Sequence, residues 1–413
     1  MGETVIEKII RNNVGKTVKP GDIVTVNVDR VMIHDIFIPF VAEKFEEMGF
    51  TKLWDPDKVV LIYDHLVPAS QLDDTRHFHA GDAFAKKYGM KNVHRSDGIC
   101  HQLMTEAGYV KPGNIVFGTD SHTTTYGCVG AFSSGIGYTE MASILGTGTM
   151  WIKVPETIKV VVDGELPENV MSKDIILRLI GDLGADGATY RALEFTGSTV
   201  KNMTVASRMT MANMAIEAGA KCALFTPDEK TAEYCGIELN DFQKSLSGDT
   251  DATYIKTITY RAEDFVPVMA CPSQVDKIRD VSDLEGTEID QVFIGSCTNG
   301  RLEDLKAAAE VLKGKKVAKY VKLIVTPASR KIYRQAIDMG IMDVLAEAGA
   351  IITHPGCGLC CGRTGGILTD GERVVATNNR NFLGRMGTSK VEIYLASPKT
   401  AAACAVAGKI VKT

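Results

Sequence analysis

The sequence predicts an α/β protein built on mainly parallel sheets. Short β-branched runs alternate with longer helical stretches: KVVLIYD (58–64) comes before SQLDDTRHFHAGDAFAKKYG, and GNIVFGTD (113–120) comes after it. The same alternation returns in IDQVFIGSC, RLEDLKAAAEVLKGKK, KYVKLIVTP, SRKIYRQAIDMGIMDVLAEAGA and IITHPGC, between residues 289 and 357. Strand, helix and strand in this order form the unit from which parallel sheets are built.

Two breaks divide the chain into three α/β domains of similar size. The stretch WIKVPETIKVVVDGELP (151–167) is typical of a β element that follows the helical, glycine-rich segment 130–150. The stretch CPSQVDKIRDVSDLEG (271–286) has the proline and polar residues of a connector. We therefore expect domains over 1–154, 155–284 and 285–413, in keeping with the usual size of about 150 residues per domain.

The composition excludes several classes of protein. The chain has 413 residues, 45% of them hydrophobic, and 46 basic residues against 51 acidic ones give a net charge of −5 without long runs of one sign. We therefore expect neither a nucleic-acid nor a membrane partner. The first residues, MGETVIEKIIRNNVGK, lack the apolar stretch of a signal peptide, which predicts a cytoplasmic protein. Ten mostly isolated cysteines do not resemble a secreted disulfide framework.

Chemically active residues follow the predicted strands. In parallel sheets, the loops that leave the carboxyl ends of the strands carry the ligands. Asp64 and His65 follow one such run, and Asp120, Ser121 and His122 follow the next. Cys297 and Cys357 follow two later runs in the same way.

The motif HPGCGLCC (354–361) places three cysteines within five residues. Cys357 and Cys360 have a spacing that lets both thiolates bind one centre, and Cys297 is available as a third ligand. A zinc site would add His354 or Cys361 as its fourth ligand. A redox dithiol would use Cys357 and Cys360 alone. An iron–sulfur cluster with three cysteine ligands would leave one iron open to substrate, and the spacing leaves all three alternatives open.

The sequence motifs around these cysteines favour one of the three kinds of site. GTDSHT, SCTNG, PGCGLC and NRNFLGR occur in this order, and together they resemble the aconitase superfamily from VDRVMIHD (28–35) to YLASPKTAAACAVAG (394–408). The resemblance implies three α/β domains around a central [4Fe-4S] cluster, one per subunit, held by Cys297, Cys357 and Cys360. Cys361 has no role in the family pattern, and the usual CGPC is CGLC here.

The resemblance also implies the residues of an active site. Those matching the family's catalytic groups are Asp64, His65, His101, Asp120, His122 and Glu217, and those matching its substrate-binding groups are His34, Ser121, Asn213, Asn379, Arg380 and Arg385. His34 stands where aconitase itself has glutamine. We expect Asn213 and Glu217 to project from one helix face. Without the resemblance, Asp120 and Ser121 would be turn residues, His101 a core histidine, and the arginines a surface pair.

The implied activity is that of a hydro-lyase that removes water from a branched hydroxy acid and adds it back. Because the chain ends after the third unit, the resemblance implies a separate small subunit that supplies the swivelling fourth domain and the catalytic serine. The expected substrate is 3-isopropylmalate, and the alternatives are the homoaconitase and 2,3-dimethylmalate dehydratase reactions. A cluster-dependent RNA-binding sensor is a remote alternative, since the sequence has no basic stripe.

Overall fold

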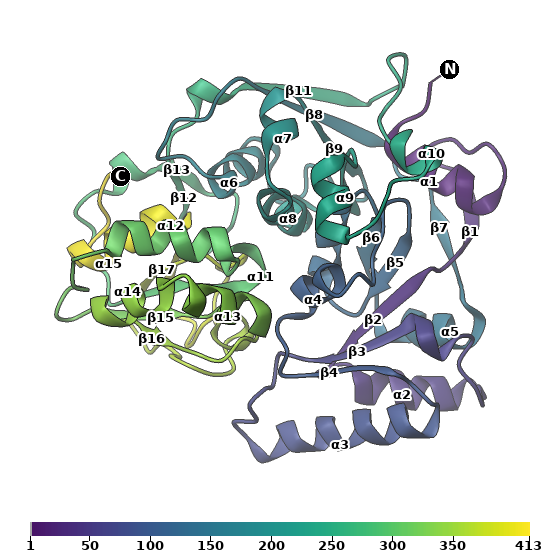
Figure 1. Cartoon of the computed structure of the whole chain (residues 1–413), viewed down its shortest axis with the longest axis horizontal. Coiled ribbons are helices and arrows are strands. Elements are labelled where there is room, and N and C mark those ends of the chain that lie inside the picture. Colours follow the sequence, from purple (N-terminus) through teal and green to yellow (C-terminus); the bar gives the residue numbers. More distant parts are fainter. Residues whose placement is uncertain (1) are drawn as a thin grey trace.

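The structure, a computed structural model that describes residues 2–413, contains three mainly parallel sheets and one small antiparallel pair. Each large sheet is formed by one continuous part of the chain. In Figure 1 the first unit (purple and blue) lies along the right side, the second (teal) at the top, and the third (green to yellow) at the left.

The first unit has a five-stranded, all-parallel sheet in the order β4-β3-β2-β5-β6. Its strands are β2 (Arg30–His34), β3 (Val59–Tyr63), β4 (Asn92–Arg95), β5 (Ile115–Gly118) and β6 (Phe132–Gly135). Its helices are α1 (Val5–Val14), α2 (Ile38–Glu47), α3 (Leu72–Lys87), α4 (Cys100–Glu106) and α5 (Tyr138–Thr147). A 3-10 helix (Ser121–Val129) follows β5, and β1 (Ile23–Asn27) pairs antiparallel with β7 (Thr149–Lys153).

The second unit has a four-stranded parallel sheet in the order β10-β9-β8-β11. Its strands are β8 (Thr157–Asp163), β9 (Ala192–Thr196), β10 (Cys222–Phe225) and β11 (Lys256–Arg261). Its helices are α6 (Ser172–Leu183), α7 (Ser198–Asn202), α8 (Val205–Met214), α9 (Glu229–Cys235) and α10 (Asp241–Lys244). Figure 1 places α8 close to the junction of the three units.

The third unit has a seven-stranded sheet in the order β13-β12-β18-β17-β14-β15-β16, in which β12 pairs antiparallel with β13 and β18 and the other pairings are parallel. Its strands are β12 (Val268–Ala270), β13 (Ile278–Asp280), β14 (Gln291–Ile294), β15 (Lys322–Val325), β16 (Ile351–Ile352), β17 (Arg373–Ala376) and β18 (Glu392–Leu395). Its helices are α11 (Ser296–Asn299), α12 (Leu302–Leu312), α13 (Arg330–Asp338), α14 (Ile341–Ala348) and α15 (Pro398–Ala407).

The central strands are buried along their whole length. Every residue of β3, β5, β10 and β14 is buried. Strands that helices cover on both faces have no solvent side, which explains why VVLIY and IVFG are continuous apolar runs rather than alternating ones. The polar residues of interest therefore come where the strands end, at one edge of each sheet.

The expected fold class, α/β with mainly parallel sheets, is confirmed. Two local expectations differ from the structure. The stretch 271–286 is more than a connector, because β13 within it pairs with β12 at the edge of the third sheet. That sheet thus begins at Val268, ahead of residue 284, and the division at residues 154 and 284 stays a prediction. The helical stretch after Ser329 is broken at Gly340, whose φ of +70° ends α13 before α14.

Every helix among the described residues falls short of the length and hydrophobicity that a bilayer-crossing helix requires.

Candidate active site

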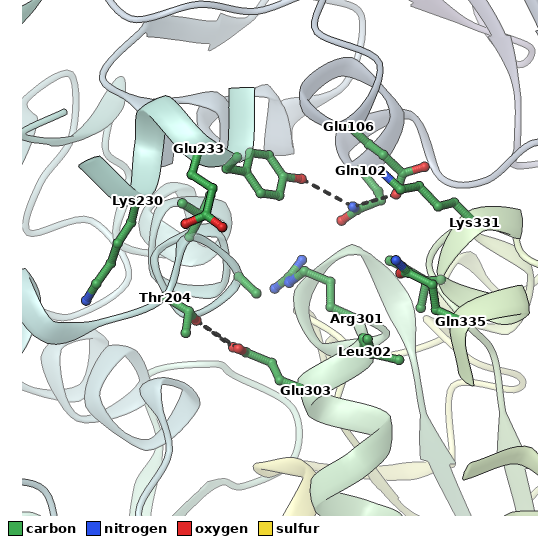
Figure 2. Close-up of a pocket in the computed structure, with 14 residues that line it drawn as sticks. Gln102, Glu106, Thr204, Lys230, Glu233, Arg301, Leu302, Glu303, Lys331 and Gln335 are labelled. Atoms are coloured by element: carbon green, nitrogen blue, oxygen red, sulfur yellow. Dashed lines mark hydrogen bonds between the residues drawn. The ribbon is translucent and has the colours of Figure 1, made fainter. Parts of the chain in front are cut away.

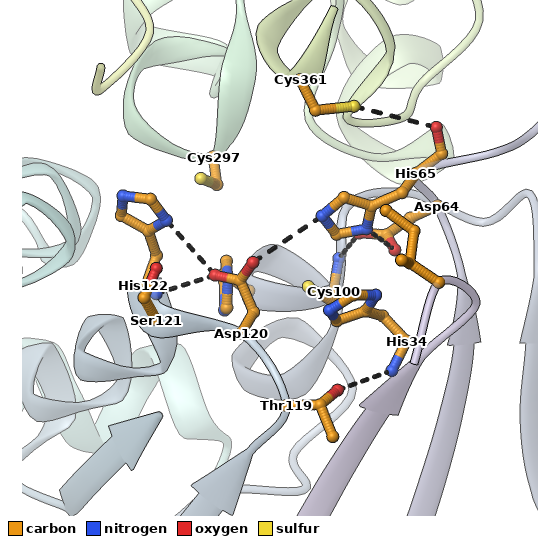
Figure 3. A network of polar contacts seen from close by, with 12 residues as sticks. His34, Asp64, His65, Cys100, Thr119, Asp120, Ser121, His122, Cys297 and Cys361 are labelled. Carbon is orange, nitrogen blue, oxygen red and sulfur yellow. Dashed lines mark hydrogen bonds and ion pairs between the residues drawn. The ribbon is translucent and has the colours of Figure 1, made fainter. Parts of the chain in front are cut away.

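The polar residues that follow β2, β3 and β5 meet in one buried cluster. His34 ends β2, Asp64 and His65 follow β3, and Asp120 follows β5. All but Asp120 are less than a tenth exposed. Figure 3 shows the Asp120 carboxylate between the imidazoles of His65 and His122, with Cys297 and Cys361 approaching from the third unit. The strand ends therefore assemble the group of acids and histidines that the sequence predicts.

Asp64 and His65 form a buried pair. Nδ1 of His65 lies 2.7 Å from Oδ1 of Asp64, and Oδ2 of Asp64 accepts the backbone N–H of Cys100 at 2.7 Å. Burial alone would lower the pKa of His65, but the charge and hydrogen bond of Asp64 outweigh it and raise that pKa well above its usual value. The pair therefore favours the protonated form of His65, whose other ring nitrogen lies 3.8 Å from Oδ2 of Asp120.

Asp120 is held by two other histidines. Its Oδ1 lies 2.9 Å from Nε2 of His101 and 3.2 Å from Nδ1 of His122, and it also accepts the backbone N–H of His122 at 2.7 Å. Burial would raise the pKa of Asp120, but these hydrogen bonds prevail and hold it well below its usual range. Asp120 is thus a carboxylate surrounded by three imidazoles.

Glu217 connects this cluster to an arginine of the third unit. Its Oε1 lies 2.8 Å from Nε2 of His122 and accepts from Nε of Arg380, also at 2.8 Å. Nη2 of Arg380 in turn donates to Oγ of Ser121 at 2.9 Å. Burial would raise the pKa of Glu217, but His122 and Arg380 lower it.

The sequence predicts that Asn213 and Glu217 project from one helix face. In the structure the two residues do not share one α-helix. Helix α8 contains Asn213 and ends at Met214, and the chain tightens into a 3-10 turn (Ala215–Ala218) that Gly219 closes with a φ of +84°. A tighter turn changes the direction of the side chains that follow it. Asn213 therefore points to Cys297, whereas Glu217 points to His122.

His34 is almost completely buried, at 1% exposure. Its ring stacks on His65 with 4.3 Å between ring centroids. Neither ring nitrogen of His34 has a hydrogen-bond partner in the described part of the chain. A buried imidazole without partners is costly unless a ligand completes it, which agrees with a place at the substrate.

The three predicted cluster cysteines lie in two short segments at the carboxyl ends of strands of the third sheet. Cys297 is in α11, directly after β14, and Cys357 and Cys360 lie in the turn after β16. Exposed fractions are 5%, 7% and 1%. The backbone N–H of Cys357 donates to the carbonyl of Asp64 at 2.7 Å, which joins this turn to the acid and histidine cluster.

Polar groups surround the sulfur atoms. The amide groups of Asn213 and Asn379 donate to Sγ of Cys297 at 3.2 and 3.4 Å. Sγ of Cys360 accepts from Oγ of Ser296 at 3.3 Å and lies 3.7 Å from Nη2 of Arg385. Donors of this kind stabilise thiolates and sulfur-ligated metal centres.

This environment fits a sulfur-ligated metal centre. Burial raises the pKa of Cys297 to about 12, so its thiolate needs a strong positive charge nearby. Three soft thiolate ligands with polar donors around them agree with an iron–sulfur cluster.

Cys361 is oriented differently from its neighbours. It is only partly buried, and its Sγ lies 3.2 Å from the carbonyl of Gly358 and 4.0 Å from that of His65. Its sulfur thus contacts backbone oxygens rather than the amide donors that surround Cys297.

Two further residues support the site, and the sequence motifs did not indicate either of them. Asp35 accepts the backbone N–H groups of His65 and Leu66 at 3.1 and 2.8 Å, and its position after the apolar run 31–33 is the signal that could have identified it. Arg301 donates to the carbonyl of Cys297 at 2.7 Å, which no local pattern predicts. Arg301 also borders a cavity of about 680 Å³ at the junction of the units. Figure 2 shows this cavity, where Thr204 binds Glu303 and Gln102 binds Glu106.

The fold and this arrangement of cysteines, acids and histidines define an aconitase-type protein, and the chain belongs to the aconitase family. Residues 7–408 match the model described as "Aconitase family (aconitate hydratase)". Membership of this family implies an iron–sulfur cluster.

Curated relatives match almost the whole chain. It is 47% identical over 411 residues to "3-isopropylmalate dehydratase large subunit 1" of Methanopyrus kandleri, covering 99% of this chain and 98% of the relative. It is also 47% identical over 413 residues to "3-isopropylmalate dehydratase large subunit 2" of Archaeoglobus fulgidus, with 99% and 98% covered. The solved structure of aconitase X from Thermococcus kodakaraensis covers 86% of this chain and 84% of its own, with a TM-score of 0.51 and 14% identity, and supports the fold alone.

Proposed function

We propose that this chain is the large subunit of a 3-isopropylmalate dehydratase. The observation that carries the proposal is the contact between the cysteine turn and the Asp64–His65 pair, where the backbone N–H of Cys357 binds the carbonyl of Asp64. It brings a group of metal ligands and a charged acid–base pair to one buried place. The relatives of 45–47% identity favour this substrate over others.

Cys297, Cys357 and Cys360 would hold a [4Fe-4S] cluster, which when bound supplies a Lewis-acid iron for the hydroxyl and a carboxylate of the substrate. Asn213 and Asn379 would orient the sulfur atoms through their amide N–H groups. Arg385, whose Nε is buried and lacks a partner among the described residues, has a donor left for a substrate carboxylate.

His65 would act as the general acid. It carries a proton at its free ring nitrogen because Asp64 stabilises the imidazolium, and that proton would pass to the substrate hydroxyl as it leaves as water. Asp120 would keep this nitrogen in place. The hydrogen bonds from His101 and His122 would keep Asp120 itself negatively charged.

Arg380, Ser121 and His34 would bind the rest of the hydroxy acid. The Arg380 guanidinium is fixed by Glu217, so that its position does not depend on the substrate. The ring nitrogens of His34, which lack hydrogen-bond partners among the described residues, would accept from or donate to the substrate beside His65.

The base that removes the carbon-bound proton would come from a small subunit, as a serine on a swivelling domain. The relatives are named large subunits, which supports a small-subunit partner for this chain. The cytoplasmic location stays a prediction.

Co-production with a candidate small subunit under anaerobic conditions tests the proposal. The unsaturated product absorbs in the ultraviolet, so turnover can be followed directly with 3-isopropylmalate, homocitrate, 2,3-dimethylmalate and citrate. We expect the highest kcat/KM with 3-isopropylmalate. A higher kcat/KM with any of the other three would assign the chain to that reaction instead.

A further inference from the structure

The mechanism above gives no role to the side of the active-site region that faces the second unit. Asp120, Ser121 and Arg380 line a cavity of about 650 Å³ that extends to the second unit. There the lining residues include Tyr190 and Lys221. A substrate bound at Ser121 and Arg380 would therefore share its space with a lysine.

Lys221 differs from the other charged groups in this cavity. Arg380 is committed to Glu217 and Ser121, and Asp120 accepts from two histidines. In the part of the chain that the structure describes, Nζ of Lys221 has neither a hydrogen-bond acceptor nor a carboxylate within 4.0 Å, and its contact is with the face of the Tyr190 ring. Of the charged residues that line the cavity, Lys221 is thus the one without an ion-pair or hydrogen-bond partner among the described residues.

The backbone holds Lys221 at this position. Its N–H donates to the carbonyl of Arg191 at 2.8 Å, immediately before β10 begins. Its ammonium lies 5.5 Å from the centroid of the Tyr190 ring. Burial lowers the pKa of Lys221, and Cys222 and Glu140 oppose that effect only in part. A half-buried ammonium without a counter-ion is costly, and an anionic ligand in the cavity would remove that cost.

We propose that Lys221 is a substrate-binding residue that pairs with the second carboxylate of the hydroxy acid. This inference rests on the proposed function and adds a residue to it. Arg385 would hold the first carboxylate on the side of the cysteines. The second carboxylate would point towards the second unit and pair with Lys221. Lys221 would thereby select substrates with two carboxylates.

The test uses the assembled two-subunit enzyme with its cluster and three competitive inhibitors. Isopropylsuccinate has both carboxylates of 3-isopropylmalate but no hydroxyl, while 4-methylpentanoate and 2,3-dimethylbutanoate each lack one carboxylate. Lys221→Met should weaken isopropylsuccinate binding by about 10- to 100-fold, the effect of one charged hydrogen bond. Of the two monocarboxylic acids, one lacks the carboxylate that pairs with Lys221, and the binding of that acid should be unchanged in Lys221→Met. Lys221→Arg should restore part of the affinity.

Lys153 is the matched control. Its Nζ also lies 5.5 Å from the Tyr190 centroid, but the residue borders a different cavity. Lys153→Met should leave all three inhibition constants unchanged. Equal losses in the two variants would mean that the lysines act only by holding Tyr190, and the proposal would be wrong.

Two further results would overturn the proposal. One is an unchanged isopropylsuccinate constant in Lys221→Met with an unchanged melting temperature. The other is weaker association of the two subunits with unchanged inhibition constants, which would assign Lys221 to an acidic group of the partner. If the wild-type enzyme turns over another hydroxy acid, the proposed function fails, and the same comparison with the deoxy analogue of that acid still tests Lys221.

Discussion

Replacing Asp64 by asparagine tests the acid–base pair directly. The asparagine has the same shape and can still accept the backbone N–H of Cys100, so the main loss is the negative charge beside His65. We expect His65 to lose its proton at neutral pH and the enzyme to lose its general acid.

The size of the effect follows from the geometry. Nδ1 of His65 lies 2.7 Å from Oδ1 of Asp64. The centres of the two charges are therefore on the order of 4 Å apart, which at an effective dielectric constant of about 20 gives about 4 kcal/mol. That energy is a factor of about 10³ in an equilibrium constant, and general acids contribute about 10²–10⁴ to a rate. We expect kcat to fall by about 10²- to 10⁴-fold.

The assay is kcat with 3-isopropylmalate, measured beside the iron and sulfide content of each variant. Asp57→Asn is the matched control, because Asp57 lies at the other end of β3 and is exposed. It should retain full activity. A fall in kcat of less than tenfold in Asp64→Asn, with iron and sulfide unchanged, would refute the role of His65 as the acid.

Two further predictions concern stability and substrate binding. Asp228→Asn should lower the free energy of unfolding by about 2 kcal/mol at pH 7, because it leaves the buried guanidinium of Arg208 without its charged partner. Burial would raise the pKa of Asp228, but Arg208 lowers it, so this contribution is present above the unfolded pKa of about 4 and disappears as the pH falls further; denaturant titrations of both proteins at pH 7 and pH 3 check this. His34→Ala should raise KM for 3-isopropylmalate by about 10-fold or more while Fe content stays constant, and an unchanged KM would remove His34 from the substrate site.

Much of the site could be predicted because it depends on local order. A strand that ends in a polar pair places that pair at the carboxyl edge of a parallel sheet, as Asp64, His65 and Asp120 show. The family motifs added the roles of the cysteines, which spacing alone left open between zinc, redox and iron–sulfur chemistry. Those roles stay predictions until they are measured.

The remainder depends on contacts between distant parts of the chain. Nζ of Lys173 donates to the carbonyls of Thr377 and Asn378 at 2.9 and 2.6 Å, across more than 200 residues. No pattern in the sequence around Lys173 indicates this contact. The proposed role of Lys221 could not be predicted from the sequence either. It follows from the lack of an ion-pair or hydrogen-bond partner for its ammonium among the described residues. The prediction of a helix through Glu217 was wrong for a local reason: the chain tightens into a 3-10 turn before Gly219.

The central claim is a cluster held by three cysteines, and its most direct test is the iron and acid-labile sulfide content of anaerobically prepared protein. We expect about four irons and four sulfides per chain for the wild type and for Cys361→Ser, and loss of both elements in Cys297→Ser and Cys360→Ser. Zinc without sulfide, or a cluster that survives Cys297→Ser but not Cys361→Ser, would contradict the account.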